Sequence, residues 1–169
     1  MKIGILSDTH NNLANLAAAL ELFEREGVRT LIHCGDFTGV EVARKMAGFQ
    51  VISVFGNGDF ASGEIREELM QQNIDNYAGL VFSGRIGEAR VAVTHGHLPG
   101  RVEELVHSGG YDYVFQGHSY HHKEERFGIT RLINPGALGG MHREERRVCL
   151  LDLSTGKTNF IKIKTGSPA

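Results

Sequence analysis

Side chains that can bind metal ions follow directly after short apolar runs at five places in this sequence. Each run has the length and the β-branched composition of a buried strand, and each ends abruptly in polar residues. Because ligands collect beyond the carboxyl ends of the strands in open α/β sheets, we expect the five segments to meet at one edge. The segments are Ser7-Asp8-Thr9-His10, Gly35-Asp36, Gly56-Asn57-Gly58-Asp59, Thr94-His95-Gly96-His97 and Gly117-His118.

The ligand types in these segments favour a transition metal over calcium. Calcium takes oxygen ligands, whereas imidazole suits zinc, iron, nickel and manganese. The five segments offer carboxylate and amide oxygens together with imidazole nitrogens. The sequence therefore predicts a mixed oxygen and nitrogen site that holds divalent cations.

The elements that position these residues follow from the hydrophobic spacing. Leu13, Leu16, Leu20 and Phe23 recur at helical intervals after an Asn, and Gly27 ends the pattern. Early strand-helix-strand units with later hairpins indicate a mixed α/β sandwich with helices on the sheet faces. Further helices are expected at 40–46, 62–72 and 101–107, and strands at 1–6, 30–34, 51–55, 77–82, 89–94, 113–116, 131–134, 148–153 and 159–163, with hairpin turns at 83–87 and 154–156 and polar loop at 117–125.

Size and composition limit the number of domains and the kinds of partner. The 169 residues suit one domain, expected at 1–164 with a flexible tail at 165–169. A formal charge of −2 argues against a generally basic surface for nucleic acid. Cys34 and Cys149 lie in apolar runs and are expected to be core thiols. Nothing in the sequence resembles a signal peptide or a membrane span, so we expect a cytoplasmic protein, with a homo-oligomer left open.

Taken in order, the five segments resemble the signature of calcineurin-like metallophosphoesterases. More narrowly, they are similar to the small YfcE-like phosphodiesterase branch, and Asn134-Pro135-Gly136 also fits that pattern. Each motif alone is weakly specific, but five in order, from residue 1 to about residue 153, are specific. The resemblance implies a calcineurin-like α/β sandwich of mixed β-sheets flanked by helices. It also implies hydrolysis of a small phosphodiester or nucleotide by a metal-bound hydroxide.

The resemblance also implies which residues bind the metals. It implies two divalent metal ions. Mn²⁺ is the expected ion, and Fe, Ni or Zn are the alternatives. Asp36 would bridge both ions. The remaining ligands would be Asp8 and His10 at the first metal and Asn57, His95 and His118 at the second.

Several further residues receive roles around the metals. His97 would act near the reacting phosphate as a catalytic or substrate-binding residue, and Asn57 would also contact substrate. Asp59 is a candidate to orient His95. Asn134-Pro135-Gly136 is expected to form a loop that closes over the site. Arg143 lies in a cluster of residues with mixed charge. We expect its side chain to be solvated, with contact to a substrate phosphate as the alternative.

Two departures from the family pattern bear on activity. Where the family usually reads Gly-His-Thr-His, this chain reads Gly117-His118-Ser119-Tyr120, so Tyr120 replaces the last ligand of the first metal. Tyr120 could coordinate instead, or His121 or His122 could substitute. The first site could otherwise be weak, prefer a different metal, or be absent, which would leave a single-metal protein. Gly58 stands where some relatives carry an acid-supplying His, which suggests diesters or leaving groups that need little acid help.

Plainer interpretations exist for each residue. Asp8 and Asp36 could cap a helix and fix a turn. His33 is expected to be a packed histidine in the core or behind the ligands, and His107 and His142 to be solvated. The main alternative function is a catalytically weakened protein-interaction scaffold on the same fold, favoured by the Tyr120 and Gly58 departures. A phosphomonoesterase ranks below the diesterase.

Overall fold

Two β-sheets lie face to face in the structure, a computed structural model that describes residues 1–141 and 144–164. The first sheet, sheet A, has the strand order β11-β10-β1-β2-β3-β4. Its four strands from β1 to β4 are parallel, and β10 and β11 extend it in an antiparallel hairpin. The strands are β1 Lys2–Leu6, β2 Thr30–His33, β3 Gln50–Val54, β4 Tyr77–Gly79, β10 Arg147–Asp152 and β11 Lys157–Lys162.

The second sheet, sheet B, has the strand order β5-β6-β7-β9-β8. Its three central strands β6, β7 and β9 are parallel, and the two edge strands run antiparallel to their neighbours. The strands are β5 Val81–Ile86, β6 Ala89–Thr94, β7 Tyr113–Phe115, β8 Lys123–Phe127 and β9 Thr130–Asn134. Both sheets therefore have a parallel centre whose carboxyl ends can carry ligands.

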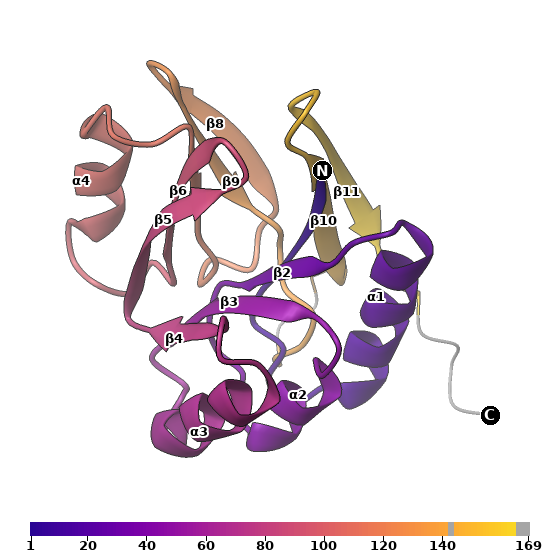
Figure 1. Cartoon of the computed structure of the whole chain (residues 1–169). Coiled ribbons are helices and arrows are strands. Elements are labelled where there is room, and N and C mark those ends of the chain that lie inside the picture. Colours follow the sequence, from indigo (N-terminus) through magenta and orange to yellow (C-terminus); the bar gives the residue numbers. More distant parts are fainter. Residues whose placement is uncertain (142–143, 165–169) are drawn as a thin grey trace.

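Helices cover the two outer faces of this sandwich (Figure 1). The helices α1 (Leu13–Arg25), α2 (Val40–Lys45) and α3 (Ser62–Gln72) pack on sheet A, and α4 (Arg101–His107) packs on sheet B. The predicted mixed α/β sandwich with flanking helices is confirmed. None of the helices in the described part of the chain is long and apolar enough to span a membrane.

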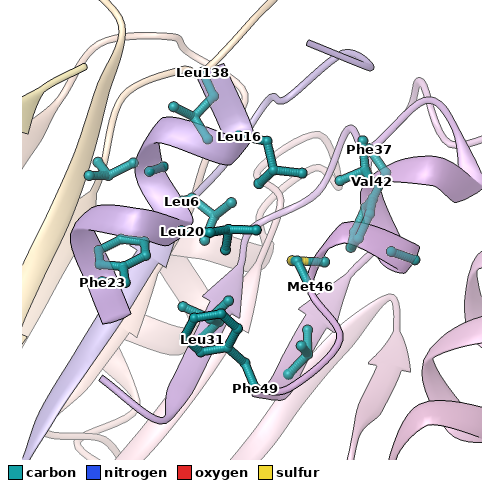
Figure 2. Close-up of a cluster of buried hydrophobic side chains, with 14 of the residues drawn as sticks. Leu6, Leu16, Leu20, Phe23, Leu31, Phe37, Val42, Met46, Phe49 and Leu138 are labelled. Carbon is teal, nitrogen blue, oxygen red and sulfur yellow. The ribbon is translucent and has the colours of Figure 1, made fainter. Parts of the chain in front are cut away.

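Helix α1 shows how the sequence encodes one of these layers. The side chain of Asn12 accepts a hydrogen bond from the backbone N–H of Asn15, which caps the helix as predicted. Leu16, Leu20 and Phe23 share one buried stripe against sheet A, as Figure 2 shows. The chain leaves the helix through Gly27 at φ 73°, a left-handed conformation that suits glycine.

A second apolar core lies between the two sheets. It contains Ile5 and Ile32 from sheet A and Val93 and Phe115 from sheet B. Alternate residues on each strand face opposite sides, so one set of residues contacts the helices and the other contacts the facing sheet. Cys34 and Cys149 belong to this inter-sheet core, as expected for core thiols.

Three predicted segments are wrong in detail. The strand expected at 77–82 is divided, because β4 pairs with β3 in sheet A and β5 pairs with β6 in sheet B. The predicted hairpin turn at 83–87 is mostly strand, and the turn lies at Gly87-Glu88. The polar segment expected at 117–125 contains the start of β8, whose charged, exposed face hides its strand character.

Candidate metal centre

The carboxyl ends of strands from both sheets converge on one site. Asp8 and Asp36 follow β1 and β2, and His95 and His118 follow β6 and β7. The predicted convergence of these segments is therefore observed. Hydrogen bonds join the loops directly: the N–H of Asp8 donates to the Gly35 carbonyl, and the N–H of Gly117 donates to the His95 carbonyl.

Two carboxylate oxygens lie between two imidazoles at the centre of the site. Oδ2 of Asp36 is 3.5 Å from Nε2 of His10 and 3.5 Å from Nε2 of His95. Oδ1 of Asp8 is 3.9 Å and 4.0 Å from the same two nitrogens. Ligand atoms of Asp8, His10 and Asp36 all lie within 4.8 Å of one another, which is the spacing of a metal-binding group.

One carboxylate oxygen of Asp8 accepts no hydrogen bond from the described residues. Its Oδ2 accepts hydrogen bonds from Ser7 Oγ at 2.6 Å and from the N–H of His118 at 3.1 Å. Its Oδ1 is buried and has no hydrogen-bond partner among the described residues. A buried carboxylate oxygen is unfavourable unless a donor or a cation compensates it, so this atom fits a metal ion.

The charges of the central residues are set by burial and by one another. Burial raises the pKa of Asp8 above its ordinary value. Burial opposes ionisation of Asp36 too, but His95, the Gly58 N–H and His10 outweigh it and lower the pKa of Asp36 to about 2. Burial lowers the pKa of His95, but the carboxylates of Asp36 and Asp8 raise it by more. The pKa of His95 is therefore above its ordinary value. The site thus attracts positive charge.

The tautomer of His95 directs a lone pair into the site. Nδ1 of His95 lies 2.7 Å from the Cys34 carbonyl oxygen, which can only accept, so Nδ1 carries a proton. Nε2 of the neutral ring is then free to coordinate and lies 3.2 Å from Nδ1 of His118. Fixing a ligand imidazole through a carbonyl at its other nitrogen is a common feature of metal sites.

The expected role of Asp59 as the partner of His95 is wrong. Asp59 is buried and accepts hydrogen bonds from the backbone N–H groups of Gly56, Asp36 and Thr38 at 2.8, 2.9 and 2.9 Å. It therefore joins the loop after β2 to the loop after β3. The partner that His95 takes instead, the main-chain carbonyl of Cys34, was not visible in the residue pattern.

Asn134 is also placed differently from the expectation. It is fully buried, and its side-chain amide donates to the Gly117 carbonyl at 2.9 Å and to Ser119 Oγ at 3.0 Å. The segment Asn134-Pro135-Gly136 therefore braces the loop that carries His118 and does not close over the site.

His97 and Asn57 are the remaining predicted site residues in the described part of the chain. The ring of His97 lies 5.4 Å from that of His95, and its buried Nδ1 has no hydrogen-bond partner within the described chain. Asn57 is exposed, and its side chain makes no hydrogen bond to any described residue. Arg143 and His142 lie outside the described residues.

Tyr120 reaches the position next to His10. Its hydroxyl is 2.7 Å from Nε2 of His10, and the two rings stack with centroids 5.7 Å apart. The hydroxyl therefore contacts the same nitrogen that faces Asp8 and Asp36. His121 and His122 are exposed, and His122 packs near Phe160 with ring centroids 5.1 Å apart.

Backbone strain concentrates around this site. In the described chain, every residue other than glycine with positive φ lies in three of the converging loops. Such conformations are uncommon and are retained where the surrounding structure enforces them, often at functional sites. They occur at Asp8, His10, Asn11, Asp36, Thr38, His118 and Tyr120.

The family follows from comparison with known sequences. Residues 1–156 match the family described as the calcineurin-like phosphoesterase superfamily domain. The chain belongs to this superfamily. The resemblance of the five motifs is thereby confirmed.

Two curated relatives support the assignment of this chain to the superfamily. Phosphodiesterase MJ0936 of Methanocaldococcus jannaschii is 37% identical over 142 residues, which cover 83% of this chain and 86% of that protein. The probable metallophosphoesterase YsnB of Bacillus subtilis is 31% identical over 149 residues, which cover 82% of this chain and 75% of that protein.

Solved structures show the same fold. An archaeal phosphodiesterase superimposes with a TM-score of 0.91 and 34% identity, over 96% of this chain and 99% of that one. The phosphoesterase YfcE of E. coli gives a TM-score of 0.66 at 20% identity, over 97% and 100% of the two chains, and shows the fold alone. The calcineurin-like sandwich expected from the sequence is therefore confirmed.

Proposed function

We propose that this protein is a divalent-metal-dependent phosphodiesterase. The observation that carries the proposal is the buried Oδ1 of Asp8, which accepts no hydrogen bond from the described residues and lies beside His10 and His95. This donor set suits a hard to borderline divalent cation. The similarity to a protein named as a phosphodiesterase, 37% identical, supports the choice of reaction.

The chain offers ligands for two metal ions. Asp8, His10 and the Tyr120 hydroxyl would hold the first, and Asp36 would hold both. His95, His118 and Asn57 would hold the second. We propose Mn²⁺ as the native ion, since mixed carboxylate and imidazole sites accept it. When bound, such ions polarise the phosphoryl oxygens and lower the pKa of a coordinated water.

The protein's own groups prepare the site for this chemistry. The Cys34 carbonyl holds the His95 ring, and the Gly58 N–H holds Oδ1 of Asp36 at 2.8 Å, so both ligands are oriented in advance. His97 lies close enough to His95 to contact a phosphate or a water bound there. Gly58 supplies no acid to the leaving group, which favours diesters with good leaving groups.

The test combines metal content with turnover. We expect about two divalent ions per chain in protein purified without chelator, measured by elemental analysis. We also expect Mn²⁺-dependent release of nitrophenolate from bis(p-nitrophenyl) phosphate, faster than from p-nitrophenyl phosphate. Asp36→Asn should lose metal and turnover together, whereas Asp75→Asn, an exposed carboxylate away from the site, should keep both.

Other outcomes separate the alternatives. Faster turnover of the monoester would identify a phosphomonoesterase. Full metal occupancy in Asp36→Asn would contradict the shared ligand. Low occupancy without turnover of either ester would favour an interaction role on this fold.

A further inference from the structure

The chain just before residue 142 lies against the position of the first metal. The N–H of Gly139 donates to the Asp8 carbonyl at 2.8 Å. A Cβ at Gly140 would lie 2.9 Å from Cε1 of Tyr120 and 3.2 Å from Cδ2 of His10. His10, Tyr120 and Gly140 also line one cleft of about 630 Å³. This stretch of chain therefore forms one wall of the space in which the first ion would bind.

The chain just after residue 143 is tied back to the same wall. The guanidinium of Arg146 donates hydrogen bonds to the carbonyls of Gly139 and Gly140. Glu144 precedes Arg146 by two residues, so these hydrogen bonds hold Glu144 close to the wall. The structure thus brings a carboxylate from a distant part of the sequence to the side of the site where Tyr120 replaces the histidine of the family pattern.

Three carboxylates act on the Tyr120 hydroxyl. Burial raises the pKa of Tyr120 above its ordinary value, and the negative charges of Asp8 and Asp36 raise it further. The charge of Arg146 lowers this pKa, and the charge of Glu144 adds to the rise. Because interactions between charges weaken with distance, Glu144 belongs to the group of anions around the first metal position.

Glu144 has a buried oxygen that nothing in the described chain compensates. Its Oε2 is buried and accepts no hydrogen bond from the described residues, and its carboxylate forms no ion pair with them. The next residue, Glu145, is exposed and pairs with Arg147 and Lys162. A buried carboxylate oxygen is unfavourable without a donor or a cation. Oε2 of Glu144 is therefore available to a cation, as Oδ1 of Asp8 is.

We propose that Glu144 is a further ligand of the first metal ion, a carboxylate that makes up for the histidine that Tyr120 replaces. A carboxylate suits the divalent ions that bind mixed oxygen and nitrogen sites. Glu144 is not in the group of ligand atoms that already lie within 4.8 Å of one another, so its side chain would turn towards the ion on binding. The inference rests on the proposed metal-dependent function and adds a ligand to its first site.

Mn²⁺ titration calorimetry of two neighbouring glutamate variants tests this role. We expect Glu144→Gln to bind the first ion at least about tenfold more weakly than the unmodified protein. Glu145→Gln is the matched control and should keep the affinity, because Glu145 already pairs with two cations at the surface. Glu144→Gln should also raise the Tm of chelator-treated protein, since it removes a buried charge, so weaker binding would not reflect unfolding.

Cobalt substitution separates direct ligation from long-range attraction. The visible absorption of Co²⁺ depends on its coordination, so at saturation we expect Glu144→Gln to change the spectrum and Glu145→Gln to leave it unaltered. An unchanged cobalt spectrum in Glu144→Gln would overturn the proposal even if the affinity fell, because Glu144 would then act through its charge alone. Equal affinities for the first ion in the unmodified protein and Glu144→Gln would overturn it as well.

The Tyr120→His background tests whether Glu144 compensates for the missing histidine. With an imidazole at position 120, the loss of affinity caused by Glu144→Gln should shrink to about threefold or less. A tenfold loss in both backgrounds would overturn the compensation, because the two side chains would then act independently. Binding of both ions without hydrolysis of any diester would contradict the proposed reaction, and the Glu144 comparison would still decide this inference.

Discussion

At the scale of single residues, His33 links the two loops that carry the buried carboxylates. Its Nδ1 accepts the Gly35 N–H at 3.2 Å, so the proton resides on Nε2, which donates to Thr9 Oγ1 at 2.8 Å. The ring also stacks on Phe37 with centroids 3.8 Å apart. The expectation of a packed histidine is confirmed, because His33 is fully buried, and its contacts hold the Asp8 loop against the Asp36 loop.

His33 should make stability depend on pH. Burial lowers its pKa from 6.5 to about 3, so it stays neutral in the folded protein while the unfolded chain takes up a proton below about pH 6.5. Stability should therefore fall as the pH drops from 6.5 towards 3. The loss attributable to this group between pH 7 and pH 5 is about 2 kcal/mol.

Urea titrations of chelator-treated protein at pH 7 and pH 5 measure this difference. His33→Gln can keep both hydrogen bonds but cannot titrate, so its free energy of unfolding should fall less over the same interval. Equal pH dependence in the two proteins would show that His33 does not control it.

Tyr120 should weaken the first metal site relative to a histidine. A phenol hydroxyl is a poorer ligand for a divalent transition metal than a neutral imidazole. We expect Tyr120→His to bind the first ion about tenfold more tightly in Mn²⁺ titration calorimetry, since each 1.4 kcal/mol changes the affinity tenfold. Tyr120→Phe keeps the ring and removes the oxygen.

Comparison of the two Tyr120 variants separates coordination from packing. If the hydroxyl contributes to binding, Tyr120→Phe should bind the first ion more weakly than the unmodified protein. Identical affinities in the unmodified protein and Tyr120→Phe would mean that the oxygen does not coordinate.

At the scale of elements, the loops after the strands approach one another too closely for side chains at certain glycines. A Cβ at Gly56 would lie 2.1 Å from Oδ1 of Asp36 and 2.8 Å from Nε2 of His95. A Cβ at Gly117 would lie 1.9 Å from Ser7 Oγ. The Gly residues beside the ligands thus permit the close approach of neighbouring loops.

Gly56→Ala should therefore displace Asp36 and impair metal binding. We expect Mn²⁺ affinity to fall at least about tenfold, measured by titration calorimetry. Gly63→Ala is the matched control, because a Cβ there meets nothing within 4 Å and alanine favours the helix α3 in which it lies. Unchanged affinity in Gly56→Ala would contradict the close approach.

At the scale of the whole molecule, the candidate metal centre lies where loops from the two sheets meet. Asp8, His10 and Asp36 come from sheet A, and His95 and His118 come from sheet B. The inter-sheet core, including Ile5 and Phe115, holds these groups in one place. A cation that binds all of them would therefore stabilise the packing of one sheet on the other.

Metal binding should stabilise the folded chain as a unit. A ligand at 100 times its Kd adds about 2.7 kcal/mol to the free energy of unfolding when it binds only the native state. We expect Mn²⁺ at that excess to raise Tm in a single calorimetric transition, and chelator to reverse the rise. The Asp36→Asn protein should show little change. Two separate transitions, with only one shifted by metal, would contradict coupling of the sheets through the site.

Many of the helices and strands could be predicted from the residue pattern, because hydrophobic periodicity and capping residues determine them locally. Leu13, Leu16, Leu20 and Phe23 follow the helical period, and Asn12 and Gly27 mark the ends of that helix. The apolar runs before Asp8, Asp36 and His95 become buried parallel strands. The strand pattern was weak in β8, because most of its side chains are exposed and charged. It was also misleading at β4 and β5, because one apolar run contributes a strand to each sheet.

The family, the sandwich and the segments that converge on the site were predictable from the residue pattern, because five strand ends with metal-capable side chains occur in a fixed order. Which atoms meet there depends on the packing of the two sheets. The tertiary structure assigned the Cys34 carbonyl to His95, three backbone N–H groups to Asp59 and the Tyr120 hydroxyl to His10. Main-chain partners leave no mark in side-chain identity, and contacts over a hundred residues apart in sequence depend on how the two sheets pack.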